Sequence, residues 1–274
     1  MLYLRIITAI VLLAVVLPVM FLGSTISVNV LCAVFFVVAC WESLRLFAHR
    51  LAIPVAIIWG AIYSWLVFTS SAQQIVVVAL IGSLAWSTQF IPALKTGLPE
   101  RDSVKNRLLS ALYGISIMAC FLVMTQFQRH SPVYLLSVMA LVWVADIGAY
   151  FCGKALGKRK LAPTISPGKS WEGAIGGCLC VLLVGSGSTM IPALGDTFSL
   201  TVLQRWGWGG LVIALTVLSA VSVVGDLFES LLKRRASMKD SSHLLPGHGG
   251  VLDRVDALIP VLPLAFLLDI VSKL

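Results

Sequence analysis

Long apolar runs, separated by short polar segments, make up most of the 274-residue sequence. A helix that crosses the hydrocarbon core of a bilayer needs about 20 predominantly apolar residues. Nine runs come close to this length, and we predict a transmembrane helix in each, at about 4–22, 25–43, 51–70, 73–93, 108–127, 132–152, 171–192, 207–229 and 255–272. The pattern therefore predicts an all-α polytopic membrane protein with about nine transmembrane helices.

The first run is interpreted as a transmembrane helix that the mature protein retains. Its apolar part extends from Ile6 to Leu22, which is longer than the roughly 7–15 apolar residues of a typical signal peptide. No A-x-A-like cleavage site follows it. We therefore expect this segment to stay in the protein as its first transmembrane helix.

Composition supports membrane embedding. Hydrophobic residues make up 59% of the chain and charged residues only 12%, whereas soluble domains carry about 25% charged residues. The six cysteines all lie in or at the edge of apolar runs, and no Cys/His metal spacing occurs. We expect the cysteines to be small buried apolar residues rather than disulfide or zinc ligands.

The net charge of +8 is explained by membrane topology rather than by nucleic-acid binding. On the nine-helix interpretation, 17 of the 20 lysines and arginines fall on one side of the membrane. The positive-inside rule makes that side cytoplasmic, with the N-terminus inside and the C-terminus outside. We therefore expect no nucleic-acid partner, and we expect the longest polar segments to face the cytoplasm.

The segment Ser230–Asp256 concentrates the polar chemistry of the chain. Its 27 positions hold ten ionisable residues and three glycines: Lys233, Arg234, Arg235, Lys239, Asp240, His243, His248, Asp253, Arg254 and Asp256, with Gly247, Gly249 and Gly250. Packing in lipid gives no reason to gather such residues. Cations, carboxylates and flexible backbone suit a site for phosphate and metal, so this segment predicts polyphosphate chemistry at a membrane surface.

Carboxylates inside predicted membrane helices add to this interpretation. Asp146 shares one helix face with Tyr150 and Lys154, and an intramembrane carboxylate is a functional hypothesis. The alternative is an Asp–Lys pair that only joins two helices. Asp226 lies near the membrane boundary on one stripe with Ser230 and Lys233. Because an unpartnered carboxylate there is costly, either a divalent metal or Lys233 should lie beside it.

Two glycine-containing segments favour phosphate binding. Gly168-Lys169-Ser170 resembles the end of a P-loop, but Pro163 stands where the earlier glycine is required and no strand precedes it. We instead expect an anion site where Ser166 and Lys169 open the next helix. Gly249 and Gly250 would let backbone amides approach a phosphate, although an ordinary tight turn uses the same residues.

The motifs together resemble the bacterial phosphatidate cytidylyltransferases, also called CDP-diacylglycerol synthases. The C-terminal signature of that family is Ser-x-apolar-Lys-Arg, four residues, Lys-Asp, a small residue two further on, then His-Gly-Gly-apolar-x-Asp-Arg-apolar-Asp. This chain matches it position by position from Ser230 to Asp256. The segments around Asp146, Ser166–Gly173 and Gly225-Asp226 also look like the family. Upstream, only the number of runs and Trp41-Glu42 match. We therefore predict N-terminal transmembrane helices over 1–139 and a catalytic transmembrane region over 140–274.

The resemblance implies a reaction in phospholipid biosynthesis. CTP and phosphatidic acid would give CDP-diacylglycerol and pyrophosphate with Mg²⁺, and a second, monovalent cation is left open. The family also implies an integral protein of the bacterial inner (plasma) membrane, with its active site facing the cytoplasm, and a homodimer. Because both substrates are anions, charge neutralisation and positioning should dominate catalysis.

The same resemblance assigns roles to residues of this chain. It places Asp226 and Asp253 at the metal site and adds Lys233, Lys239 and Arg254 as the other catalytic residues, which would neutralise phosphate charge. His248 is expected to be a ligand-contacting donor or a turn residue rather than a base. The full set of expected substrate-binding residues is Asp146, Ser166, Lys169, Arg234, Asp240, His248, Gly249, Gly250 and Asp256.

Three other classes of membrane protein fit the sequence less well. A CDP-alcohol phosphatidyltransferase should carry an Asp-Gly pair in its motif, and no Asp-Gly pair occurs in this chain. A transporter should distribute polar residues through its helices, whereas here most of them crowd one surface. A structural subunit would leave the segment Ser230–Asp256 unexplained. These contrasts favour an interfacial enzyme.

Overall fold

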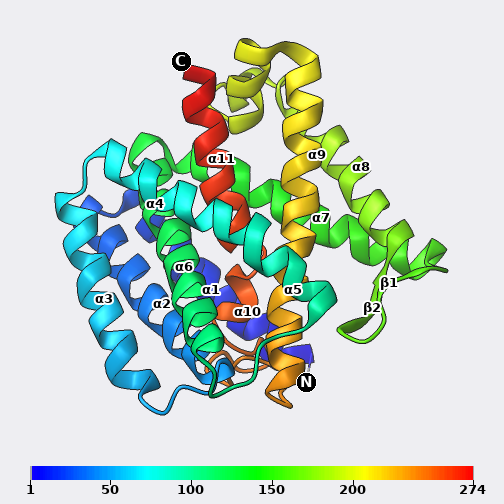
Figure 1. Cartoon of the computed structure of the whole chain (residues 1–274). Coiled ribbons are helices and arrows are strands. Elements are labelled where there is room, and N and C mark those ends of the chain that lie inside the picture. Colours follow the sequence, from blue (N-terminus) through cyan, green and yellow to red (C-terminus); the bar gives the residue numbers. More distant parts are fainter. Residues whose placement is uncertain (1, 274) are drawn as a thin grey trace.

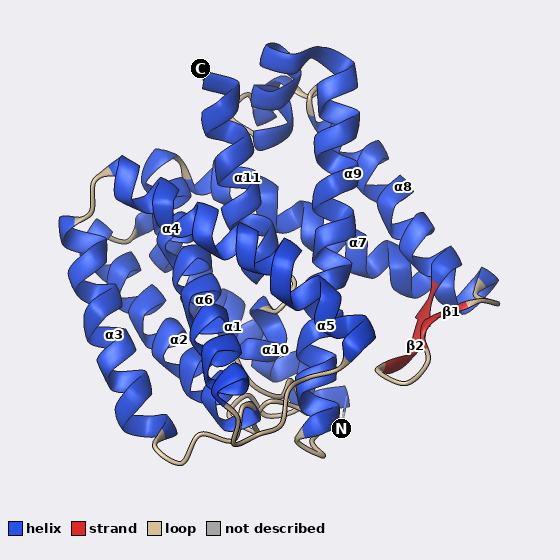
Figure 2. Ribbon diagram, in the orientation of Figure 1, coloured by secondary structure: helices blue, strands red, loops and turns tan. Residues whose placement is uncertain are grey.

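The computed structural model describes residues 2–273, which form a bundle of long helices with one small β-hairpin (Figures 1 and 2). A π-helical stretch at Trp86–Phe90 joins α4 to α5, and a single 3₁₀ turn at Pro192–Leu194 precedes α9. The elements are α1 (Leu2–Leu22), α2 (Thr25–Leu46), α3 (Ala52–Thr69), α4 (Ala72–Ala85), α5 (Ile91–Thr96), α6 (Val104–His130), α7 (Pro132–Leu156), β1 (Lys160–Ala162), β2 (Ser166–Ser170), α8 (Trp171–Ser188), α9 (Phe198–Arg235), α10 (Leu252–Val255) and α11 (Leu258–Lys273).

The prediction of an all-α polytopic membrane protein is confirmed. Within residues 2–273, eight helical segments are long and apolar enough to cross a membrane. The first predicted span forms α1, a helix of 21 residues. The boundary predicted between 139 and 140 falls inside α7, so no linker separates the two predicted regions.

Two predicted spans end elsewhere in the structure. The span predicted at 171–192 stops at Ser188, the last residue of α8. The span predicted at 207–229 belongs to the longer α9, which begins at Phe198 and continues to Arg235. The backbone is non-helical at Gly207, where φ is 65°. This break divides α9 into a short first part and a long second part, and the predicted span covers most of the second part.

The segment 166–170 is a strand, which corrects the expectation that it opens a helix. Proline and glycine are poor helix formers, and the extended backbone of β2 instead pairs antiparallel with β1, Lys160 opposite Ser170. Helix α8 starts one residue later, and the Ser170 side chain caps it by accepting a hydrogen bond from the Gly173 N–H at 3.1 Å. Ser166 and Lys169 therefore project from a hairpin rather than from a helix N-terminus.

Helices α7 and α8 approach each other closely through small residues. A Cβ atom on Gly173 would lie 2.8 Å from the Ala149 carbonyl oxygen, and one on Gly177 would lie 2.5 Å from that of Ala145. Such contacts leave no space for a side chain, as expected of small-residue helix pairs in membranes. This packing places the Asp146 face of α7 beside the hairpin and the start of α8.

An aromatic cluster fixes the part of α9 that carries the polar residues. The fully buried Phe228 ring lies 5.6 Å from Trp86, 4.6 Å from Phe90 and 5.2 Å from Tyr113, measured between ring centroids. These partners belong to the α4–α5 segment and to α6, so three parts of the chain meet at one side chain. Because Phe228 stands next to Glu229, this packing also holds the acidic positions of α9 in place.

Candidate active site

Nine of the predicted site residues line one cavity of about 610 Å³, which we call the central cavity. Its walls come from α7, β2, the start of α8, α9 and the residues around α10. The nine residues are Asp146, Ser166, Lys169, Asp226, Lys233, Asp240, Asp253, Arg254 and Asp256. Tyr150 and Lys154 lie in the same lining, so the predicted shared face of Asp146, Tyr150 and Lys154 is confirmed.

A second cavity of about 510 Å³, the loop pocket, adjoins the first. Its lining includes Lys239, His248 and Gly249, and it shares Asp240 and Arg254 with the central cavity. The turn around His248 is closed by hydrogen bonds, including one of 2.8 Å from the Leu245 N–H to the Gly249 carbonyl oxygen. The polar segment thus contributes to two adjoining spaces rather than one.

Two predicted residues lie outside both linings. The Arg234 side chain is directed to the hairpin, where its Nε donates to the Ile165 carbonyl oxygen at 3.2 Å. The Gly250 N–H donates to Oδ2 of Asp253 at 2.8 Å. This amide already has a carboxylate partner inside the protein, so the geometry differs from the expected approach of the Gly250 amide to a phosphate.

The cation beside Asp226 is Lys169, not Lys233. The Lys169 ammonium lies 2.6 Å from Oδ2 of Asp226, and the Ser230 hydroxyl donates to Oδ1 at 3.2 Å. Lys169 reaches this position because β2 passes beside α9. Sequence reasoning offered a divalent metal or Lys233 as the partner, whereas Lys169 comes from a hairpin 57 positions earlier in the chain. Both side chains of the pair are part-exposed at the cavity wall.

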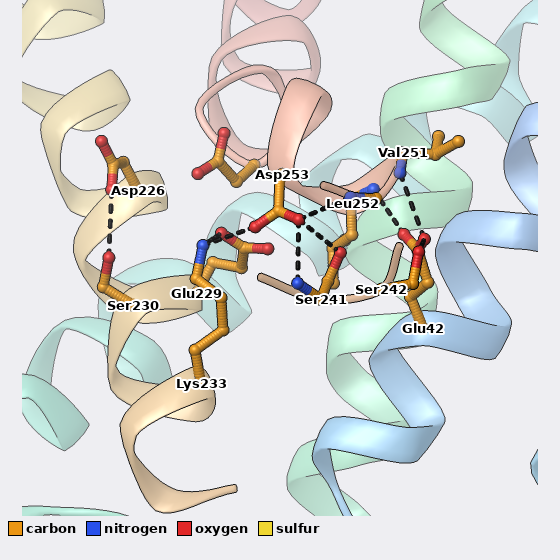
Figure 3. A network of polar contacts seen from close by, with 12 residues as sticks. Glu42, Asp226, Glu229, Ser230, Lys233, Ser241, Ser242, Val251, Leu252 and Asp253 are labelled. Carbon is orange, nitrogen blue, oxygen red and sulfur yellow. Dashed lines mark hydrogen bonds and ion pairs between the residues drawn. The ribbon is translucent and has the colours of Figure 1, made fainter. Parts of the chain in front are cut away.

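Lys233 bridges two buried carboxylates (Figure 3). Its ammonium lies 2.5 Å from Oε2 of Glu229 and 2.6 Å from Oδ1 of Asp253. Glu229 is fully buried, and the Asp253 side chain is only 5% exposed. Buried charges need such partners. The sequence analysis gave Glu229 no role, although its carboxylate shares the Lys233 ammonium with Asp253.

Asp253 organises the loop before α10 through its second oxygen. Oδ2 accepts hydrogen bonds at 2.8 Å from the N–H and the hydroxyl of Ser241 and from the N–H of Gly250. A Cβ on Gly249 would lie 2.6 Å from this oxygen, and φ at Gly249 is 82°. Only glycine combines that backbone conformation with so close an approach, which explains one of the glycines in the motif.

Glu42 holds the same loop from the opposite side (Figure 3). This fully buried carboxylate of α2 accepts from the Ser242 hydroxyl at 2.5 Å and from the N–H groups of Val251 and Leu252 at 3.2 and 2.6 Å. Sequence reasoning used Glu42 only as a weak point of resemblance. A carboxylate within an apolar run was the available signal, and only the fold shows that it contacts the loop.

We expect Glu42→Ala to destabilise the protein. The substitution leaves the Ser242 hydroxyl and two backbone N–H groups buried without their acceptor, and each such group costs about 1–3 kcal/mol. Thermal unfolding of the purified protein measures the effect. Glu42→Gln keeps one acceptor oxygen and should lose less. Glu100→Ala removes an exposed carboxylate and is the control; equal unfolding temperatures for all three variants would contradict the anchoring role.

The carboxylates of the central cavity suit a magnesium ion that binds together with a phosphate ligand. Asp146, Asp226, Asp253 and Asp256 all line the cavity. Across residues 2–273, no three His, Cys, Asp or Glu side chains form a group that could hold a metal by themselves. Mg²⁺ commonly uses only one or two carboxylates and completes its shell with waters and substrate phosphates. The donor chemistry therefore fits Mg²⁺ in that mode.

Comparison with known proteins relates nearly the whole chain to one protein family. The sequence profile described as "Cytidylyltransferase family" matches residues 3–271. A phosphatidate cytidylyltransferase of Haemophilus influenzae is 42% identical over 174 residues, which cover 58% of this chain and 56% of the relative. One from Pseudomonas aeruginosa is 51% identical over 129 residues, covering 47% and 44%. One from Staphylococcus epidermidis is 34% identical over 266 residues, covering 95% and 96%. The chain thus spans about half the length of the first two relatives and nearly all of the third.

Proposed function

The chain belongs to the cytidylyltransferase family, and we propose that it transfers CMP from CTP to phosphatidate, giving CDP-diacylglycerol and pyrophosphate. The observation that carries the proposal is the central cavity, which carboxylates and cations from four distant segments of a bundle of membrane-spanning helices line together. The names of the relatives from three bacteria support the same reaction.

The proposed chemistry needs no strong general base. Phosphatidate is a phosphomonoester whose second pKa is about 6, so it is mostly dianionic at neutral pH. One of its oxygens forms a new bond to the α-phosphorus of CTP. The bond from that phosphorus to the bridging oxygen breaks, and pyrophosphate leaves with the electron pair. The obstacle is repulsion between two anions, which positioning and charge neutralisation overcome.

Three cations are available for this neutralisation. Lys154 and Arg254 line the central cavity, and Lys239 lines the loop pocket. Within the described part of the chain, none of these three side chains has a carboxylate within 4.0 Å. The ion pairs found there involve His130, Lys169 and Lys233 instead. Lys233, in contrast, is occupied by Glu229 and Asp253. We assign phosphate binding to the three available cations and assign Lys233 to holding the site together.

Asp226 and Asp253 would hold Mg²⁺, with Asp146 and Asp256 nearby in the same lining. When bound, the ion would neutralise phosphate charge and orient the reacting groups. Asp226 is the more accessible of the two: its side chain is 31% exposed, whereas that of Asp253 is 5% exposed. A second, monovalent cation remains part of the proposal without a residue assigned to it.

The location of the protein is proposed from charge and exposure. The family resemblance suggests the bacterial inner membrane, and the distribution of lysines and arginines favours a cytoplasmic active site by the positive-inside rule. Tyr150 lines the central cavity and is 63% exposed, and Trp171, which follows the lining residue Ser170, is 54% exposed. Such side chains suit the level of the lipid headgroups, where phosphatidate would enter. The homodimer remains a proposal from family resemblance.

The test is a transfer assay on protein purified in detergent. Labelled CTP and Mg²⁺ are added, and label in the lipid phase is followed with and without phosphatidate. We expect labelling that requires phosphatidate, stops when EDTA removes the metal, and matches pyrophosphate release one to one. Protein shown to be folded that labels no lipid would contradict the proposal and favour transport or another acceptor.

A further inference from the structure

A groove separate from the central cavity runs between α2, α3 and the first turns of α6. It consists of a wider mouth of about 450 Å³ and a narrow slot of about 120 Å³. His49, Val55 and Arg107 line both parts, so the two spaces are continuous. None of the residues that line this lateral groove lines the central cavity. Figure 1 shows the α2–α3 loop and the start of α6 at the same end of the bundle.

The mouth of the lateral groove carries excess positive charge. Arg50, Arg101 and Arg107 line it against a single carboxylate, Asp102. Among the residues that the structure describes, neither Arg50 nor Arg107 has a carboxylate within 4.0 Å. Partial burial and the neighbouring Arg107 lower the pKa of His49, so the imidazole adds polarity rather than charge near neutral pH. The mouth is therefore built to attract an anion.

The slot beyond the mouth is mostly apolar, although Ser43 and Ser110 line it together with His49 and Arg107. Leu44, Val55, Trp59, Ala111 and Gly114 line it between α2, α3 and α6. Exposed aliphatic residues neighbour the lining residues in the sequence: Ile58, before Trp59, is 58% exposed, and Leu108, after Arg107, is 60% exposed. In a membrane, these side chains would face acyl chains. An anion that enters the mouth would thus have its apolar part beside a lipid-facing slot.

We propose that the lateral groove binds an anionic glycerophospholipid, with the headgroup phosphate at Arg50 and Arg107 and the start of one acyl chain in the slot. Basic pockets between membrane helices at the cytoplasmic side suit anionic headgroups. A surface that only obeyed the positive-inside rule would need no apolar slot joined to its arginines. A zwitterionic lipid would bring a second cation to the mouth and fit it less well.

Lipid binding would affect α9 through Asn106, a residue at the floor of the groove. Asn106 lines the mouth and is 1% exposed. Its Oδ1 accepts from Arg235 at 2.7 Å, and its Nδ2 donates to the Arg101 and Phe47 carbonyl oxygens at 2.8 and 3.1 Å. Arg235 is the last residue of α9, which also carries Asp226. Lipid in the groove would therefore stabilise the loop and helix end that support the catalytic helix.

The test measures lipid-dependent thermal unfolding of the full chain in a neutral detergent. The probes are phosphatidylglycerol, phosphatidylcholine with the same acyl chains, and glycerol 3-phosphate. A ligand that binds only the folded state raises the unfolding temperature. We expect phosphatidylglycerol to raise it most, and Arg50→Gln with Arg107→Gln to weaken that effect by about tenfold or more in lipid concentration. The matched control is Lys95→Gln with Lys105→Gln, which removes equal charge from exposed positions outside the groove and should respond like the unmodified protein.

Several outcomes would overturn the lipid site. These are equal stabilisation by phosphatidylcholine, full stabilisation by glycerol 3-phosphate alone, or equal losses in the arginine and lysine pairs. Ala111→Phe supplies a test that keeps every charge, because it fills the slot. It should remove the phosphatidylglycerol effect, and an unchanged response would also contradict the proposal. The assay needs no CTP or phosphatidate, so its failure is distinguishable from failure of the proposed transferase activity.

Discussion

Asparagine at position 226 should lower the rate of CDP-diacylglycerol formation by about 10²- to 10³-fold, the usual cost of losing one electrostatic catalytic group. The substitution removes the charge that pairs with Lys169 at 2.6 Å and that we assign to metal binding. Asparagine keeps the shape of the side chain and an oxygen that can accept from Ser230. Because the site is part-exposed, the folded state should remain stable. Initial rates at saturating CTP and Mg²⁺ measure the effect.

Asp196→Asn is the matched control for this experiment. Asp196 also pairs with a basic side chain, His130, at 3.1 Å, and it lies outside the central cavity. We expect this variant to keep the activity of the unmodified protein, since exposed pairs contribute little. A folded Asp226→Asn protein with near-normal activity would contradict the metal assignment. Equal losses in both variants would show that any ion pair affects the rate through the fold.

Lys233→Met should destabilise the protein by about 3–5 kcal/mol, the usual result of removing one partner from a buried charge cluster. Glu229 would keep a fully buried carboxylate, and Asp253 would lose the cation at 2.6 Å from its Oδ1. Methionine fills similar volume, so the loss should come from the unpaired charges rather than from a void. Denaturant unfolding in a fixed detergent measures the free energy.

A second substitution separates charge from packing at this site. Glu229→Gln in the Lys233→Met background removes one of the two unpaired charges and should recover part of the lost stability, a coupling that a double-mutant cycle measures. If packing alone mattered, the second change would add its own cost. If the Lys233→Met variant had the same unfolding free energy as the unmodified protein, the ammonium would not be what holds Glu229 and Asp253 together.

Much of the fold could be predicted because it depends on local patterns. Runs of apolar residues determined where helices form, and only their ends shifted, as at Ser188 and Phe198. Five residues of the motif from Ser230 to Asp256 line the central cavity, and others line the adjoining loop pocket. The spacing of that motif agrees with the turn at Gly249 and with the hydrogen bonds that the two carboxylate oxygens of Asp253 accept from other residues of the motif.

Contacts between distant segments could not be predicted in the same way. The pattern along one helix placed Lys233 on the same stripe as Asp226. It could not identify Lys169, because Lys169 belongs to a hairpin that packs against this helix. The extended conformation of 166–170 also arises from pairing with 160–162. For Glu42 the local signal is only a carboxylate within an apolar run, and its partners lie 200 or more positions later in the sequence. Such residues are identified only when the fold brings them together.

The anchoring of the loop by Glu42 has a consequence for biogenesis. Chains enter the membrane from the N-terminus as they are synthesised, so α2 inserts about 200 residues before Ser242 leaves the ribosome. Until then its carboxylate lacks the three donors that satisfy it in the finished protein, and an unpaired carboxylate among lipid is unfavourable. The carboxylate gains these donors only when the loop from Ser242 to Leu252 has been made and has packed against α2. A chain truncated before that loop would therefore keep the Glu42 carboxylate without these three hydrogen-bond donors.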